Sequence, residues 1–414
     1  MKILRIPSIQ INKGLYIVTN VFVSTIGFIR SFVFMKGLDL YELGIITIIQ
    51  TIILLLSMSQ FGLINGGYRV LALNIAKQNE KVNNLLFSFL GILTAFLFLL
   101  WGSTLFFNFR ISHSLLIVTF IIGVLTLIVT WLTNSLVAKQ QLAELNKLNL
   151  ISSLFALCSL PLAFLWGVQG AVMVLFVQPT VFVVVCLAKN KDLRPTFFTL
   201  DNQLIKYVLR FGFIPFIAGI FTLVNVQIER WSILEILGTE ALGRFYLVFL
   251  FSTLFVLIPT SLLNLFFPQC VKLYEGSDVI QFKTQIRKHF ILLSTYLIIA
   301  ILGSVTLLKP FIAFFLPMHV ENVEYVYYYL PGLIALGLCD TFALIFNSVV
   351  RLKPILWAGG TSVLINLGLI YFSHRMNIFT LSTMSIIKSL NCIYIFVFYV
   401  ISLFVLRRKI FNKL

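Results

Sequence analysis

Long apolar runs alternate with short polar breaks along the whole chain. A helix that crosses a membrane needs about 20 mostly apolar residues to span roughly 30 Å of hydrocarbon, with its backbone hydrogen bonds kept inside the segment. The pattern therefore predicts an all-α integral membrane protein with twelve transmembrane helices. These are 15–35, 42–66, 84–107, 114–137, 148–166 and 169–188 in the first half, and 207–229, 242–267, 289–308, 325–350, 354–373 and 378–406 in the second.

Two polar interruptions, 189–206 and 270–288, are longer than the others. The first separates two sets of six runs. We therefore expect an N-terminal six-helix lobe over 1–188, a cytoplasmic linker over 189–206 and a C-terminal six-helix lobe over 207–414.

A short motif recurs in the two halves. Leu-Asp-Leu-Tyr-Glu-Leu-Gly at 38–44 precedes the second run, and Leu-Gly-Thr-Glu-Ala-Leu-Gly at 237–243 precedes the eighth. Chance similarity between common residues is the alternative explanation. If the motif marks a repeat of six helices, both copies share one orientation, and a central cavity is expected between the lobes.

The composition supports a membrane protein. Apolar residues make up 60% of the chain and charged residues 11%, whereas soluble domains contain roughly 45–50% apolar residues. The net charge of +17 suggests nucleic acid as a partner only if basic residues cluster, and here they lie at the ends of apolar runs. No nucleic-acid partner is expected.

The basic residues also predict the topology. If the N-terminus is cytoplasmic, the predicted outer segments hold only Lys36, Arg110, Lys309 and Arg375, and most other Lys and Arg residues fall inside. By the positive-inside rule this distribution places both termini in the cytoplasm.

Motifs of several enzyme classes are missing from the sequence. It contains no Gly-x-x-x-x-Gly-Lys, no Gly-x-Ser-x-Gly and no His-Glu-x-x-His, and its four histidines are scattered near the ends of runs. These are the patterns of phosphate cradles, serine nucleophiles and zinc sites. We expect no catalytic residue, no metal and no cofactor, and a transporter rather than an enzyme.

Four cations lie in or at the edge of predicted spans. They are Arg30, Lys388, Arg230 and Arg244. Because an ionised side chain at the bilayer centre costs roughly 2.5–3.5 kcal/mol on insertion scales, such residues usually face a wet interior. We interpret the four as substrate-binding residues of a cationic cavity for phosphate or acidic sugar. Internal salt bridges and snorkelling are the alternatives.

Two carboxylates and several amides accompany these cations. Asp340 in the tenth span and Glu229 at the end of the seventh are candidates for coupling to a proton or for structural pairing, with Lys388 as a candidate partner of Asp340. Amide side chains that either bind sugar hydroxyls or bond between helices are Asn20, Gln50, Asn225, Gln227, Asn366 and Asn391.

The chain resembles the multidrug/oligosaccharidyl-lipid/polysaccharide exporter superfamily, and within it the Wzx-type O-antigen repeat-unit flippases. The resemblance covers essentially the whole chain. Its motifs are degenerate: Gly-Leu-Asp-Leu-Tyr-Glu-Leu-Gly at 37–44, Gln-Phe-Gly-Leu at 60–63 with Arg69, Glu229-Arg230, Leu237-Gly238, Gly-Arg-Phe-Tyr at 243–246, Pro259 and Pro268.

The resemblance implies a function in O-antigen and polysaccharide biosynthesis. Such flippases move an undecaprenyl-diphosphate-linked oligosaccharide across the bacterial inner membrane by alternating access. The implied partners are this substrate, membrane lipids, and polysaccharide polymerase and chain-length proteins. Arg30 matches a first-helix arginine of these flippases, and the other cations match by placement alone.

Two other functions remain open. A cation-coupled small-molecule or multidrug exporter of the same superfamily requires an acidic ion site. A membrane enzyme of polysaccharide assembly, such as a polymerase or ligase, is expected to have a large outer loop, and no predicted outer segment is long.

Overall fold

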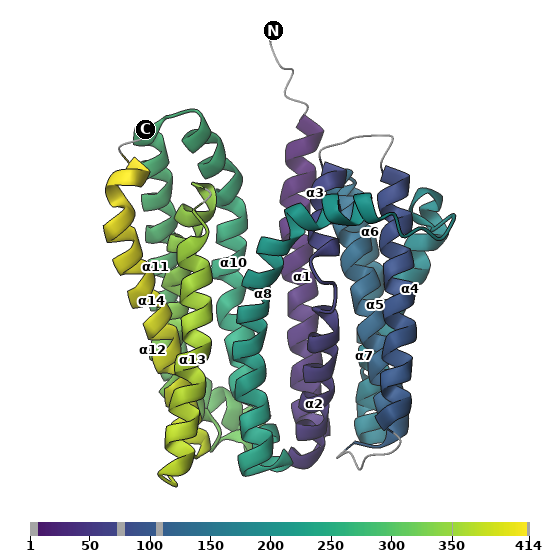
Figure 1. Ribbon diagram of the computed structural model, residues 1–414. Coiled ribbons are helices and arrows are strands. Elements are labelled where there is room, and N and C mark those ends of the chain that lie inside the picture. Colours follow the sequence, from purple (N-terminus) through teal and green to yellow (C-terminus); the bar gives the residue numbers. More distant parts are fainter. Residues whose placement is uncertain (1–6, 73–78, 105–110, 350, 412–414) are drawn as a thin grey trace. The chain divides into compact units, whose positions relative to one another are not determined.

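The computed structural model describes residues 7–72, 79–104, 111–349 and 351–411, with most of their side chains. The chain divides into two compact units, Met1–Ile220 and Phe221–Leu414. Within each unit the long helices run roughly side by side (Figure 1). The predicted linker 189–206 lies inside the first unit, and the lobe boundaries remain a prediction.

Unit 1 contains seven complete helices and the first part of an eighth. They are α1 (Pro7–Gly37), α2 (Leu40–Ser57), α3 (Leu63–Ala72), α4 (Asn79–Thr104), α5 (His113–Ala138), α6 (Leu142–Cys158), α7 (Pro161–Lys189) and α8 (Asn202–Leu237), with the short 3-10 helix η2 (Lys191–Leu193) before α8.

Unit 2 contains the rest of α8 and six further helices. They are α9 (Thr239–Arg244), α10 (Tyr246–Glu275), α11 (Val279–Phe315), α12 (Val323–Ser348), α13 (Lys353–Arg375) and α14 (Leu381–Phe411), with the 3-10 helix η3 (Pro317–His319) before α12. The regular structure of the described residues is thus entirely helical.

Several helices are able to span a membrane. In the described part of the chain, nine helices are long and apolar enough to do so, or ten if the two parts of α8 form one broken span. The protein is therefore a multi-pass membrane protein. The predicted total of twelve spans is not reached by this count and remains a prediction.

Two predicted spans are interrupted. The run 42–66 ends as α2 at Ser57 and restarts as α3 at Leu63, with positive φ angles of 48° at Phe61 and 84° at Gly62. The run 148–166 ends as α6 at Cys158 and restarts at Pro161, because proline lacks the N–H that a continuing helix needs. Predicting these two runs as single helices was wrong, since hydropathy does not register breaks in the backbone.

The recurring motif at 38–44 begins a helix. Asp39 caps α2, since its side chain accepts a hydrogen bond from the Glu42 backbone N–H at 2.8 Å and the Glu42 carboxylate accepts one from the Asp39 N–H at 3.1 Å. This reciprocal arrangement satisfies two N–H groups that a helix start leaves open.

The core of unit 1 includes the first part of α8. Leu204 and Val208 are buried in one apolar cluster with Ile64 of α3, Leu85 of α4 and Trp131 of α5. The start of α8 therefore belongs to this core, although the polarity of the sequence around it suggests a position between two lobes.

Glycines allow α8 to approach the break between α2 and α3. A Cβ on Gly212 would lie 1.9 Å from the Gly62 carbonyl oxygen, and one on Gly66 would lie 2.0 Å from the Val208 carbonyl oxygen. Just beyond this contact α8 bends by 58°, between Asn202–Phe213 and Phe216–Leu237. We call the contact of Gly62, Gly66 and Gly212 the glycine contact.

In unit 2, α12 is the most buried of the nine candidate spans, with 61% of its apolar stretch covered. Gly332 on α12 permits close packing, because a Cβ there would lie 2.5 Å from the Ser389 Cα of α14. Phe346 of α12 and Tyr399 of α14 continue this packing in one apolar cluster with Phe266 of α10. Of the candidate residues of unit 2, Glu229 and Arg230 lie on α8, Asp340 on α12 and Lys388 on α14.

Candidate functional site

A buried ion pair joins two distant helices of unit 2. The Lys388 ammonium on α14 donates to the Glu229 carboxylate on α8, and the two residues are only 7% and 5% exposed. The sequence suggests Asp340 as the partner of Lys388, but in the structure the partner is Glu229. Asp340 is half-buried on α12.

Aromatic rings lie beside Lys388 and the neighbouring Arg230. Lys388 Nζ lies 5.3 Å from the centroid of the Phe249 ring and 5.0 Å from that of Tyr329. The Arg230 guanidinium carbon lies 4.7 Å from the same Phe249 centroid. Ring faces attract cations electrostatically, and the attraction strengthens where water is excluded.

We call Glu229, Arg230 and Lys388 the charged group. Two cations and one carboxylate give it a formal charge of +1 when all three are ionised. Its guanidinium and ammonium are both groups that bind anions such as phosphate. The sequence identifies all three residues, whereas Phe249 and Tyr329 carry no signal that separates them from other aromatic residues of the core.

Three amides meet one turn away from the charged group. Asn225 Oδ1 accepts from Asn366 Nδ2 at 3.3 Å and from Asn391 Nδ2 at 3.2 Å. Asn225 Nδ2 donates to Ser362 Oγ at 2.8 Å and to the Phe221 carbonyl at 3.2 Å. These bonds tie α8, α13 and α14 together, which is the interhelical role that the sequence leaves open.

The same cluster has unused acceptors. Asn366 and Asn391 are buried, and the Oδ1 atom of each has no hydrogen-bond partner among the described residues. Gln227 is buried too, while Gln50 is half-buried. The side chain of Asn20 lies outside the described part of the structure.

Arg30 makes its contact within unit 1. Its guanidinium Nη1 donates to Gln178 Oε1 of α7 at 3.1 Å, and Gln178 Nε2 donates to Ser153 Oγ of α6 at 3.4 Å. This chain of polar groups links α1, α7 and α6. Hydropathy and charge give no reason to choose Gln178 or Ser153 as neighbours of Arg30.

Arg244 is placed differently from the other cations. It donates to Glu240, four residues earlier, at 2.9 Å, and the two side chains are 39% and 57% exposed. An exposed pair of this kind contributes roughly 0–1 kcal/mol. The pairing is the salt-bridge alternative that the sequence leaves open.

Two histidines of unit 2 contact polar neighbours. His289 Nδ1 lies 3.1 Å from Thr341 Oγ1, and His319 Nδ1 lies 3.2 Å from Asn322 Nδ2. Among the described residues, no three His, Cys, Asp or Glu side chains are arranged to hold a metal ion.

Solved structures with the same architecture are membrane transporters. An inward-facing multidrug-resistance MATE family transporter of the MOP superfamily matches with a TM-score of 0.74 at 12% identity, over 95% of this chain and 98% of its own. The lipid II flippase MurJ in an inward closed conformation matches with a TM-score of 0.72 at 14% identity, over 94% of this chain and 87% of its own.

The chain has the fold of these solved transporters. A MOP superfamily transporter from Pyrococcus furiosus, described by the reversed polarity of its binding pocket, shares this fold with a TM-score of 0.64 at 12% identity, over 97% of this chain and 95% of its own. Neither a protein-family model nor a curated protein sequence matches the chain. At these identities the likeness shows the fold and leaves the function and the substrate open.

Proposed function

We propose that this MOP-fold protein is a flippase, which moves an undecaprenyl-diphosphate-linked oligosaccharide, such as an O-antigen repeat unit, across the bacterial inner membrane by alternating access. The observation that carries the proposal is the charged group. Arg230 and Lys388 flank one phenylalanine ring inside a membrane-embedded unit, and one carboxylate accompanies them.

The chemistry of the substrate explains why such a group is useful. A diphosphate and its sugars lose hydration on entering hydrocarbon, and without replacement partners each unpaired polar group costs several kcal/mol. Guanidinium offers a planar fork to phosphate oxygens, and ammonium offers a compact charge. Arg230, Lys388 and Arg30 supply both kinds of group.

The comparisons support the substrate class at the level of the fold. MurJ is a lipid II flippase, and the P. furiosus transporter is described by a pocket of reversed polarity. A lipid-linked substrate and an altered pocket charge thus both occur on this fold. The cations of the present chain favour an anionic substrate over a cationic one.

The location and orientation of the protein follow from the same proposal. The basic residues of the predicted inner segments support cytoplasmic termini by the positive-inside rule. In this proposal the host is a bacterial cell, and the substrate is carried from the cytoplasmic to the periplasmic leaflet. Polysaccharide polymerase and chain-length proteins would then receive the product on the periplasmic side.

A second function is favoured by one observation. Glu229 is a buried carboxylate inside a fold shared with a MATE transporter, and a buried carboxylate is a candidate ligand for the coupling cation of a small-molecule exporter. In that case Glu229→Gln abolishes drug resistance conferred by the chain, and polysaccharide export is not observed.

Complementation tests the flippase proposal. The chain is expressed in bacteria that lack their own repeat-unit flippase, and surface polysaccharide is measured together with the amount of protein in the membrane. Wild type should restore polysaccharide, and Arg30→Ala and Lys388→Ala should each lose more polysaccharide than any fall in their amount of protein in the membrane accounts for. Lys309→Ala, which removes an exposed cation near the end of α11, serves as the control. Polysaccharide at wild-type level in both site variants contradicts the proposal.

A further inference from the structure

The loop 190–201 of unit 1 is held firmly against α4. Asn84 exchanges two hydrogen bonds with Thr196, its Nδ2 donating to Thr196 Oγ1 at 2.9 Å and its Oδ1 accepting from the Thr196 N–H at 2.9 Å. Asn83 Nδ2 donates to the Leu193 carbonyl at 3.1 Å, and the Thr199 N–H donates to Ser88 Oγ at 2.9 Å. The conformation of the loop is therefore fixed by its own contacts.

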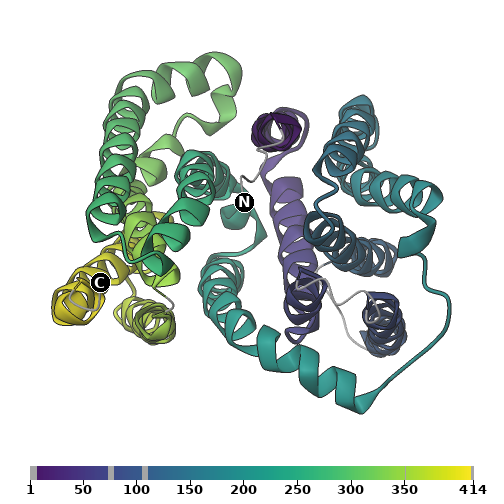
Figure 2. The same ribbon diagram turned by 90° about the horizontal axis from the view of Figure 1, so that it is seen from above.

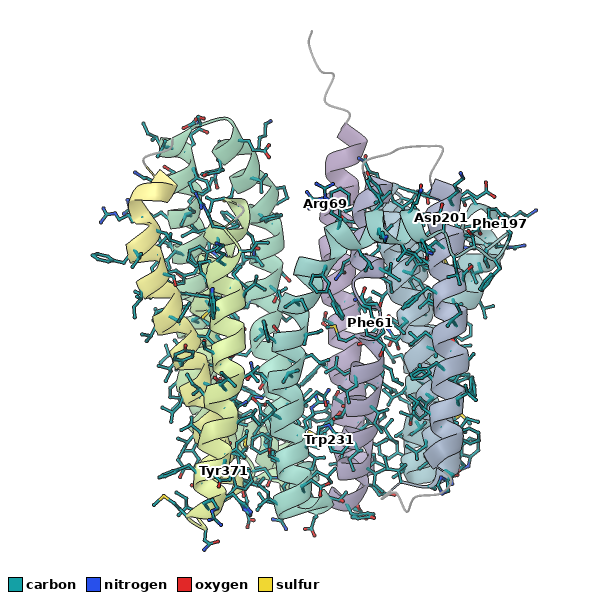
Figure 3. All side chains as sticks on the ribbon, in the orientation of Figure 1. Phe61, Arg69, Phe197, Asp201, Trp231 and Tyr371 are labelled. Carbon is teal, nitrogen blue, oxygen red and sulfur yellow. The ribbon has the colours of Figure 1, made fainter. Side chains whose placement is uncertain are left out.

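This fixed loop presents apolar side chains outward. Phe197 and Phe198 are 51% and 68% exposed, and Leu200 is exposed as well. Figure 3 shows Phe197 near Asp201 at the same end of the unit as Arg69. Because the backbone around these residues is held by hydrogen bonds, their exposure is a property of the fold.

The first part of α8 continues the surface as an amphipathic helix. Leu204 and Val208 are buried in the core of unit 1, whereas Lys206 and Arg210 are exposed. Figures 1 and 2 show this part of α8 lying crosswise to α4 and α5. The apolar face of this crosswise segment packs on the protein, so its basic face is the one left for an outside partner.

The nearby carboxylates are engaged elsewhere. Asp192 pairs with Lys139, and the Glu80 carboxylate accepts from Thr196 Oγ1 at 3.0 Å. Asp201 caps α8 by accepting from the Gln203 and Leu204 N–H groups at 2.8 and 3.2 Å. Among the described residues, Lys206 and Arg210 have no carboxylate partner.

A third cation lies on the neighbouring helix. Arg69 of α3 is exposed, and its guanidinium carbon lies 5.2 Å from the Phe211 ring centroid of α8. Lys206 and Arg210 repel each other at a spacing of four residues. Lys206 and Arg210 thus lie on α8, which follows the loop with Phe197 and Phe198, and Arg69 lies beside Phe211 farther along α8. An anion is a suitable ligand for this cationic surface.

We propose that Arg69, Lys206 and Arg210, with Phe197 and Phe198, form a binding surface for acidic phospholipid. The phosphate headgroup lies on the cations, and the two rings enter the boundary between headgroups and acyl chains. We call these five residues the lipid surface. The three cations favour an acidic lipid, because a zwitterionic lipid has no net charge with which to neutralise them. The two exposed rings favour a lipid over a protein partner, because such rings can enter the boundary between headgroups and acyl chains.

The proposal is independent of the transported substrate and is tested without it. Purified full-length protein is placed in nanodiscs of phosphatidylcholine alone or of an equimolar mixture with phosphatidylglycerol. Thermal unfolding is recorded in both, and the lipids that remain bound are identified by native mass spectrometry. Wild type should unfold at a higher temperature with phosphatidylglycerol and should retain it preferentially, and high salt should weaken both effects.

Matched variants locate the effect. Lys206→Gln with Arg210→Gln should reduce the preference for phosphatidylglycerol by about fivefold per cation, the equivalent of about 1 kcal/mol for each cation near an anionic surface. Phe197→Ser with Phe198→Ser should weaken retention of both lipids. The control is Lys309→Gln with Arg375→Gln, which removes two exposed cations of unit 2 and should leave the preference unchanged.

Two results overturn the proposal. One is equal retention and equal unfolding temperature of wild type in the two lipid compositions. The other is a loss of preference in the Lys309/Arg375 control as large as in the Lys206/Arg210 variant, since the effect would then follow total charge. Because polysaccharide export is not measured, neither result bears on the flippase proposal.

Discussion

Lys388 and Glu229 form a buried ion pair although 159 positions separate them in the chain. The pair connects α14 with α8, and Arg230 lies beside it over the ring of Phe249. Taking two charges out of water is costly, and their attraction repays this cost only when both partners are present. The two residues therefore have to be considered together.

Removing one partner of this pair should destabilise the protein. We expect Glu229→Gln and Lys388→Met each to lower the free energy of unfolding by roughly 3–5 kcal/mol, because each leaves an uncompensated buried charge. The double variant Glu229→Gln/Lys388→Met should lose less than the sum of the two. Unfolding in detergent, followed by tryptophan fluorescence, measures these differences, and strictly additive losses would show that the pair has no coupling.

Exchanging the two charges separates stability from recognition. Glu229→Lys/Lys388→Glu keeps an ion pair between α8 and α14 and should recover much of the lost stability. If the ammonium also binds substrate from α14, polysaccharide export should remain low in this folded variant. Full export by the exchanged pair would mean that the pair is purely structural.

The amide cluster should be sensitive to its central residue. Asn225→Leu removes the acceptor of Asn366 and Asn391 and the donor to Ser362. Each buried polar group left without a partner costs about 1–3 kcal/mol, so the variant should unfold well below the wild-type temperature. The control is Gln203→Leu, which replaces an exposed amide near the start of the same helix. If both variants lower the unfolding temperature equally, the amide cluster does not contribute specifically to stability.

The glycine contact gives a prediction with a matched control on one helix. Gly212→Ala places a Cβ 1.9 Å from the Gly62 carbonyl oxygen, so α8 has to move away from the break between α2 and α3. Gly219→Ala, where the nearest side-chain atom would lie 3.8 Å away, should instead stabilise the helix by roughly 0.5–1 kcal/mol. The unfolding temperatures of both variants measure this difference. A Gly212→Ala protein that unfolds at the wild-type temperature would contradict the prediction.

Arg30 offers a test of geometry rather than charge. Arg30→Lys keeps the positive charge but loses the planar fork and its bond to Gln178. If Arg30 binds phosphate through two parallel hydrogen bonds, polysaccharide export in the complementation assay should fall close to the level of Arg30→Ala. Export near the wild-type level in Arg30→Lys would show that charge alone suffices.

The sequence predicts most of the helices because apolar length is a strong signal. It misses the break before Leu63 and the restart at Pro161, since both depend on local backbone geometry within an apolar run. The start of α8 resembles a linker in the sequence because one of its faces is polar. Its close packing depends on Gly212, whose role is visible only when Gly62 is beside it.

For the candidate site, the sequence identifies the charged residues but not their partners. Charges within apolar runs are easily found, so Arg30, Glu229, Arg230 and Lys388 can all be named from the sequence. Pairing is set by three-dimensional packing, and Lys388 joins Glu229 rather than Asp340 for that reason. Phe249 cannot be singled out among the 42 phenylalanines of the chain.

The distance along the chain between Glu229 and Lys388 also has a consequence for biosynthesis. At about 5–20 residues per second, a ribosome needs roughly 8–30 s to reach Lys388 after it has made Glu229. During this interval α8 is inserted before its final counter-ion exists. Truncation anywhere before α14 leaves the carboxylate without that lysine, so shortened chains should be recognised and degraded by membrane quality control.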